Sequence, residues 1–233
     1  EDGIRVSVKL SKLCNLISNI TGLERIRYLT SHPNDIENDL INEHYTNKKL
    51  MPFLHLPIQS GSDKILKRMN RNHSRNDYMN LVRNIKSKIN NMAFSSDFIV
   101  GYPGETDHDF NQTIDLIEHV GFASSYSFKY SPRPGTQSSL KHPNVVNDNV
   151  SDLRLKKIQE ILNKQQSEFN LKFIDKNEEV LFTDKGKKDN QFVGRTKYLQ
   201  PVHVLCNRNI IGKKLEVNLE SLTSFSFHGK IVN

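Results

Sequence analysis

Short apolar runs alternate with segments of helical spacing over roughly the first 135 residues. The apolar runs predict four strands, at residues 25–30, 53–57, 94–101 and 122–131. Between them, apolar side chains recur every three to four positions, which predicts helices at residues 10–20, from Asp35 to about Tyr45, from Ser62, from Asn76 and at 106–120. This alternation is typical of parallel strands joined by crossover helices, so the pattern predicts an α/β fold.

A different pattern begins after residues 132–150, a stretch rich in Pro and Asn that is typical of a loop. Ser151 to about Phe173 has helical spacing and predicts a connecting helix. Five short alternating runs follow, at residues 178–183, 191–196, 201–206, 213–219 and 224–232. Five strands so close together predict a small antiparallel β-barrel of the OB-like kind that binds oligonucleotides. We therefore divide the chain into residues 1–150, a connecting helix at 151–170, and residues 171–233.

The composition excludes several classes of protein. Hydrophobic residues make up 36% of the 233 residues, and no apolar run approaches the ~18 residues that cross a bilayer, so we expect no membrane partner. Cys14 and Cys206 are too far apart in the sequence for a local metal site or a disulfide framework, which favours a reducing cytoplasm. The chain opens on EDGIR, with no secretory signal and no initial Met, and we expect the natural protein to begin further upstream.

The net charge of +7 is unevenly distributed. Residues 151–233 carry 15 Lys and Arg against 10 Asp and Glu, whereas residues 1–150 carry 18 against 16. Five basic residues lie in or beside one predicted hairpin: Lys185, Lys187, Lys188, Arg195 and Lys197. A solvated charged face is one interpretation of such a run. The barrel pattern and the charge together favour RNA binding through the phosphate backbone.

Polar residues follow the predicted strands where the loops of a parallel sheet converge on ligands. After the strand at 53–57, Gln59 and Ser60 could hydrogen-bond a polar ligand, and Gly61 permits a close backbone approach. The alternative is that this stretch serves to cap the following helix, with Ser62 or Asp63 as the capping residue.

Two further loops carry charged candidates. Residues 97–106 form a tight turn with two glycines and a proline, suited to a flat ring or a carboxylate. Asp97 and Glu105 could act as general acid or base, or they could be a strand-end hydrogen bonder and a helix-start acid. Arg133, flanked by prolines, could hold a carboxylate or phosphate, or it could be a surface arginine in a turn.

Four motifs in order resemble those of the radical S-adenosylmethionine methylthiotransferases. They are TSHP at 30–33, FLHLPIQSGSDKILKRMNR at 53–71, SSDFIVGYPGET at 95–106 and YSPRPGT at 130–136. The resemblance covers essentially the whole chain, and the tail looks like the TRAM domain of that family. The first two motifs resemble the tRNA-modifying branch more than the branch that modifies a ribosomal protein.

The resemblance implies a fold and an activity. Residues 1–150 would be the carboxyl-terminal part of a TIM-like radical SAM barrel, and residues 171–233 an RNA-binding TRAM barrel. The enzyme would add a methylthio group to isopentenyladenosine beside the anticodon, using S-adenosylmethionine and two [4Fe–4S] clusters to break an aromatic C–H bond. Its partners would be the tRNA anticodon stem-loop and an electron donor to the cluster.

The resemblance also suggests cofactor contacts. The segment from Asp97 to Glu105 matches the strand segment that flanks the adenosyl group in the family. Gln59 and Ser60 match strand-end positions expected to touch the ribose or the methionine part, and Arg133 lies where a carboxylate partner could sit.

One departure from the family is large. The chain lacks the CxxxCxxC loop that binds the catalytic cluster and the three cysteines of a second cluster. Cys14 and Cys206 are best interpreted as small buried hydrophobic residues. We therefore expect a carboxyl-terminal fragment that is inactive alone. Two alternatives are an enzyme acting on threonylcarbamoyladenosine in tRNA and a truncated, non-catalytic RNA-binding paralogue.

Overall fold

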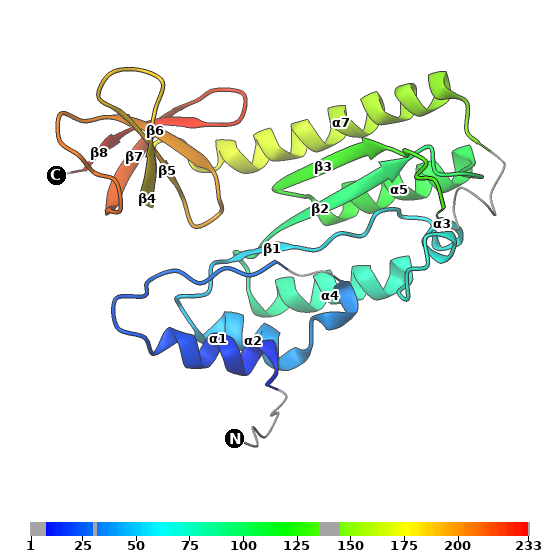
Figure 1. Cartoon of the computed structure of the whole chain (residues 1–233), viewed down its shortest axis with the longest axis horizontal. Helices are drawn as coiled ribbons and strands as arrows, with labels where there is room; N and C mark the ends of the chain where they lie inside the picture. Colours follow the sequence, from blue (N-terminus) through cyan, green and yellow to red (C-terminus); the bar gives the residue numbers. More distant parts are fainter. Residues whose placement is uncertain (1–7, 30–31, 136–144, 233) are drawn as a thin grey trace.

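The computed structural model describes residues 8–29, 32–135 and 145–232. It contains a three-stranded parallel sheet with helices, followed by a long helix and a closed five-stranded barrel (Figure 1). The predicted α/β class and the change to a β-barrel are thus confirmed. None of the helices in these three ranges is long and apolar enough to cross a membrane.

The sheet has the order β1-β2-β3 and is built from β1 (Phe53–His55), β2 (Ala93–Val100) and β3 (Ser124–Lys129). All neighbours are parallel, and Ser95 is in register with both His55 and Ser124. The predicted strand at 25–30 is wrong for its described part, where Ile26 makes only an isolated bridge to Leu50. Here the flanking side chains of Arg25 and Arg27 bond to the barrel instead.

The helices between the strands begin at side-chain caps, of which the sequence predicts the one at Ser62. α3 (Asp63–Arg68), α4 (Arg75–Lys88) and α5 (Asp107–Val120) begin after Ser62, Ser74 and Thr106, whose hydroxyls accept backbone N–H groups. The last two form capping boxes with Asp77 and Asp109.

The beginning of the chain contains two short helices. α1 (Leu10–Ser18) packs on α2 (Asn38–Thr46). Asp35 does not cap α2 as expected, because Pro33 begins a short 3-10 helix, Pro33–Asp35, whose first turn is capped by the His32 ring.

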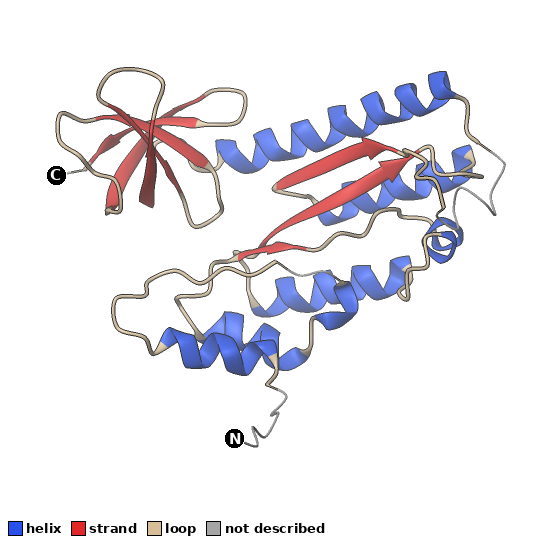
Figure 2. Ribbon diagram, in the orientation of Figure 1, coloured by secondary structure: helices blue, strands red, loops and turns tan. Residues whose placement is uncertain are grey.

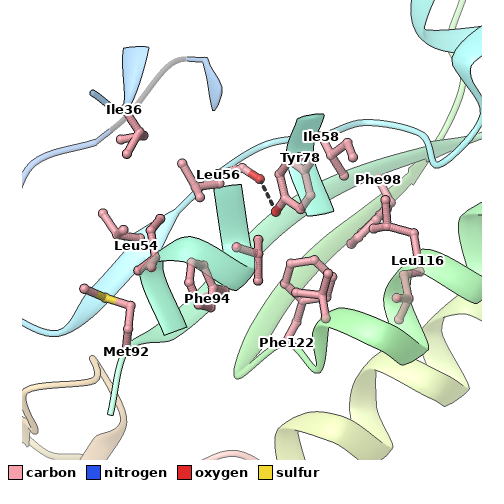
Figure 3. Packing of buried hydrophobic residues seen from close by; sticks show 14 of the residues in the cluster. Ile36, Leu54, Leu56, Ile58, Tyr78, Met92, Phe94, Phe98, Leu116 and Phe122 are labelled. Carbon is pink, nitrogen blue, oxygen red and sulfur yellow. Dashed lines mark hydrogen bonds between the residues drawn. The ribbon is translucent and has the colours of Figure 1, made fainter. Parts of the chain in front are cut away.

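The core lies between the sheet and its helices. Alternate residues of β1 and β2 face this side, so Leu54, Phe94 and Phe98 pack there with Phe122, which precedes β3 (Figure 3). Tyr78 of α4 is also fully buried, and its hydroxyl donates to the Leu56 carbonyl at 3.0 Å. The apolar side chains on this face of the sheet are buried against the helices, and the opposite face of the sheet carries other side chains.

The connecting helix begins slightly earlier than predicted. α7 runs from Asp148 to Leu171 and packs along β3 and α5 (Figure 1). Ile158 and Leu162 enter the core beside Phe122. Of the predicted loop at 132–150, residues 136–144 lie outside the described residues.

The five predicted barrel strands are all present (Figure 2). They are β4 (Asn177–Lys185), β5 (Gln191–Arg195), β6 (Pro201–Leu205), β7 (Lys214–Leu222) and β8 (Phe227–Ile231). They close in the order β4-β5-β6-β8-β7. The barrel is not wholly antiparallel, because β6 and β8 pair in parallel. β6 and β8 must pair directly for the barrel to close, although β7 lies between them in the sequence.

Candidate functional site

The carboxyl ends of the strands meet at the edge of the sheet that points away from the barrel (Figure 1). Gln59 lies there in the left-handed region, with φ of 74°. Its N–H donates to the Asp97 carbonyl and its own carbonyl accepts the Ile99 N–H, both at 2.9 Å. The backbone of Gln59 is therefore fixed to β2 at the point where a ligand would meet the edge.

Ser60 lies inside the protein, with no exposed surface. Its Oγ accepts the Ser62 N–H at 3.2 Å and lies 3.4 Å from Oγ1 of Thr113 on α5. A side chain on the neighbouring Gly61 would come within 2.5 Å of the Gln112 carbonyl. The loop after β1 is thus tied to α5, and contact of Ser60 with a ligand stays a prediction.

Glu105 is also internal. Its Oε2 accepts the Gly101 N–H at 2.8 Å and pairs with Nη1 of Arg154 on α7, also at 2.8 Å. Burial raises the pKa of Glu105, although the Gly101 hydrogen bond and Arg154 oppose this effect. The arrangement holds the turn after β2 in place, and an acid or base role for Glu105 stays a prediction.

Asp97 lies on the opposite face of β2 from the core. There Oδ2 of Asp97 is 3.5 Å from Nε2 of His55, and Nδ1 of His55 is 2.7 Å from Oγ of Ser95. The carboxylate and the ring are only partly exposed. The sequence pattern does not indicate His55 as a site residue, although it belongs to one of the four motifs. Pairing between β1 and β2 brings it to Asp97.

Two tyrosines and one arginine complete this edge. Tyr102 and Tyr130 meet edge to face with ring centroids 5.0 Å apart, and the Tyr102 hydroxyl donates to the Arg68 carbonyl at 3.0 Å. Arg133 is exposed in the turn after β3. The structure thus places Gln59, Asp97 and Arg133 on or beside one edge of the sheet.

A cavity of about 540 Å³ lies at the other half of the sheet, between the open face and the barrel. His55 and Ser95 line it from the sheet, Asn170 from α7, and Tyr198 and Gln200 from the barrel. No sequence pattern indicated this cavity, because its walls come from segments that are distant in the chain.

The five basic residues of the predicted RNA surface do not lie together. Lys185, Lys187 and Lys188 are at the β4–β5 turn. Arg195 and Lys197 are at the opposite end of β5, where Lys197 pairs with Glu178 at 3.3 Å. RNA contact by either group stays a prediction.

An iron–sulfur cluster needs several suitable ligand side chains that lie close together. No group of three or more His, Cys, Asp or Glu side chains in the described ranges could hold a metal ion. Cys14 is 1% exposed and its thiol pKa is raised by burial, whereas Cys206 is half-buried against the barrel core. The described residues therefore do not suit an iron–sulfur cluster.

Comparison with known proteins identifies relatives. Residues 7–117 match the family model of the Radical SAM superfamily. The chain is 50% identical over 195 residues to the tRNA-2-methylthio-N(6)-dimethylallyladenosine synthase of Ehrlichia ruminantium (strain Welgevonden), and 48% identical over 196 residues to the enzyme of that name from Ehrlichia chaffeensis. Each match covers 84% of this chain and 44% of the relative. The resemblance seen in the four motifs is confirmed.

Proposed function

We propose that this chain, whose residues 7–117 match the family model of the Radical SAM superfamily, serves in a tRNA methylthiotransferase. The reaction is addition of a methylthio group to N6-dimethylallyladenosine, the same nucleoside as isopentenyladenosine, beside the anticodon. One observation carries the proposal: the 50% identity extends over 195 of 233 residues, so it includes both the sheet and α7. The chain spans 44% of the length of these relatives, and the activity is proposed for the protein to which it contributes.

The edge at the carboxyl ends of the strands suits S-adenosylmethionine in the chemistry of its side chains. The Asp97 carboxylate and the Gln59 amide offer partners for ribose hydroxyls or an ammonium group, and the Arg133 guanidinium offers one for a carboxylate. When bound, S-adenosylmethionine supplies the methyl group and the adenosyl fragment of the chemistry. This chain orients the methyl group and the adenosyl fragment. Ser60 and Glu105 hold in place the loops that follow β1 and β2.

Residues 1–150 belong to a TIM-like barrel, α7 connects it, and the closed β-barrel is a TRAM domain that grips the anticodon stem-loop. The clusters of the enzyme, and the electron donor that serves them, involve residues other than those described. A tRNA substrate places the enzyme in the cytoplasm.

The activity is tested by mass spectrometry of nucleosides in tRNA from a strain lacking the gene. We expect loss of 2-methylthio-N6-dimethylallyladenosine and accumulation of N6-dimethylallyladenosine. Loss of the methylthiolated threonylcarbamoyl derivative alone would favour the alternative enzyme. Unchanged modification would favour a non-catalytic RNA-binding paralogue.

The cofactor edge is tested by calorimetric titration of the chain with S-adenosylmethionine. Asp97→Asn should weaken binding about tenfold, because it removes one charge-assisted hydrogen bond. Ser127→Ala is the matched control, since Ser127 is in register with Phe98 and lies on the core face of the sheet. Equal affinities for wild type and Asp97→Asn would remove Asp97 from the cofactor site.

A further inference from the structure

The cavity between the sheet and the barrel borders the carboxyl-end edge, because His55, 3.5 Å from Asp97, and Tyr126, in register with Asp97, both line it. It is lined by Ser95 at the beginning of β2, whereas the edge follows Val100. At about 3.3 Å per residue, these two positions are roughly 16 Å apart. In Figure 1 the arrowheads of β2 and β3 point away from the barrel, so the cavity extends toward the barrel and the edge lies beyond the other end of the strands. A ligand in the cavity would therefore lie next to a cofactor at the edge, on the side toward the barrel.

A fixed polar group is aimed into this cavity. The Thr196 hydroxyl donates to Oε1 of Gln200 at 2.8 Å, and Nε2 of Gln200 donates to Oδ1 of Asn170, also at 2.8 Å. The three residues are 0%, 6% and 2% exposed. This chain of hydrogen bonds fixes which way the Asn170 amide points, because its oxygen is already committed to Gln200.

The nitrogen of the Asn170 amide is available to a ligand in the cavity. Nδ2 of Asn170 donates no hydrogen bond to any residue in the described ranges, and Asn170 is among the cavity-lining residues. Gln166, one helical turn earlier on α7, also lines the cavity. Two amides on one helix face thus offer donors and an acceptor to the same ligand. Side-chain amides of this kind suit the polar edge of a nucleobase.

The other walls are aromatic and basic. Tyr126 of β3 and Phe225 of the β7–β8 turn are 61% and 49% exposed and line the cavity from opposite elements. Arg195 lies at its margin, where Nη1 donates to the Leu199 carbonyl at 3.1 Å. Exposed aromatic rings, an amide edge and a guanidinium are the groups that bind an unstacked nucleotide.

We propose that this cavity binds one unpaired nucleotide of the RNA loop, with its base against Tyr126 and Phe225, its polar edge on Asn170 and Gln166, and its phosphate beside Arg195. The proposal rests on the proposed tRNA substrate and adds a second nucleotide site to it. The barrel contributes Arg195 and Phe225, and the sheet contributes Tyr126, so a base can be held only where the two are fixed together. The two parts are joined by Arg25 and Arg27, whose guanidinium groups donate to barrel carbonyls.

The probes are a fluorescently labelled anticodon stem-loop RNA and a blunt duplex with the same stem and the same number of phosphates. Wild-type chain should bind the stem-loop more tightly than the duplex. Phe225→Ala and Tyr126→Ala should each weaken stem-loop binding about tenfold, because each variant removes a ring that stacks on a base, while duplex binding stays unchanged. Phe128→Ala is the matched control: Phe128 is 53% exposed on the same strand and face but does not line the cavity.

A second measurement separates ligand contact from loss of folding. With 2-aminopurine placed in turn at each loop position, one position should show fluorescence quenching on binding, and Tyr126→Ala should abolish it. Gln166→Met removes one half-buried amide of the cavity wall without burying a charge, and it should weaken stem-loop binding while the unfolding midpoint remains close to wild type. Wild-type affinity and quenching in Tyr126→Ala and Phe225→Ala would overturn the nucleotide site. If wild-type chain bound neither RNA, the proposed tRNA substrate itself would fail.

Discussion

Arg154 of α7 forms a buried ion pair with Glu105, with 2.8 Å between Nη1 and Oε2 and side chains that are 7% and 1% exposed. The pair joins the long helix to the turn that follows β2, and Glu105 in turn accepts the Gly101 N–H. The loop at the proposed cofactor edge is therefore positioned by a helix that packs along β3 and leads to the barrel.

Removing one partner of this ion pair should lower the free energy of unfolding. Arg154→Ala leaves the Glu105 carboxylate buried without its cation, and we expect the free energy of unfolding to fall by about 3 kcal/mol. The measurement is the urea midpoint of the chain. Lys164→Ala is the control, because the Lys164–Glu168 pair on the same helix is exposed and 3.9 Å long, and it should change stability by less than about 0.5 kcal/mol. Similar effects for the two variants would contradict a structural role for the buried pair.

Asp109 should make stability depend on pH under acid conditions. Burial opposes ionisation of its side chain, but hydrogen bonds from Lys64, Thr106 and Ser62 outweigh this effect and hold the pKa of Asp109 well below 3.8. Because the folded-state pKa is the lower one, the stabilisation is present above about pH 3.8 and is lost as the pH falls below it.

Asp109→Asn should therefore lower stability at pH 7 by about 2 kcal/mol and flatten the acid limb of a plot of urea midpoint against pH. Asp115→Asn is a suitable comparison. Asp115 pairs with Arg75 at 2.8 Å, but its side chain is 57% exposed, so we expect a much smaller change in the midpoint. An unchanged acid limb in Asp109→Asn would show that other carboxyl groups control it.

Two arginines should fix the orientation of the barrel. Arg25 donates to the Arg195 and Glu179 carbonyls at 2.9 and 2.8 Å, and Arg27 donates to the Lys197 carbonyl at 2.7 Å. In the double variant Arg25→Ala/Arg27→Ala, we expect both parts to remain folded and the radius of gyration measured by small-angle X-ray scattering to increase.

The same double variant should bind the anticodon stem-loop about tenfold more weakly, because the walls of the cavity no longer face each other. Lys214→Ala provides the comparison. Its pair with Glu24 also joins the two parts, at 2.6 Å, but the Glu24 side chain is 56% exposed and the pair should contribute little. An unchanged scattering profile in the double variant would show that packing of α7 alone holds the barrel.

The β4–β5 turn offers a separate test of RNA contact. Lys187→Glu/Lys188→Glu should weaken binding of stem-loop and duplex alike, because phosphates carry no sequence information. The slope of log affinity against log salt should fall by about 1 for each phosphate that the turn no longer neutralises. Lys156→Glu/Lys157→Glu, on α7, makes the same charge change at another place. Equal effects from both pairs would mean that overall charge, rather than this turn, attracts the RNA.

Much of the local structure could be predicted from the sequence because its causes are local. Ser62 and Thr106 begin their helices through bonds to groups three residues away. The alternation around Val180, Phe182 and Val217 identifies barrel strands, since every second residue must face the core. The same reasoning failed at residues 25–30, where the apolar pattern does not reveal that two arginines bond to the barrel.

Residue order and short-range periodicity were enough to define the α/β class, the capped helices, the five barrel strands and the motifs that resemble those of the methylthiotransferases. Packing in three dimensions was needed to establish that Glu105 faces Arg154, 49 residues later, and that Ser60 faces Thr113, 53 residues later. Packing also brings Asn170, Tyr126 and Phe225 to one cavity. These relationships could not be predicted because burial and hydrogen-bond partners arise where distant segments meet, and local spacing carries no record of them.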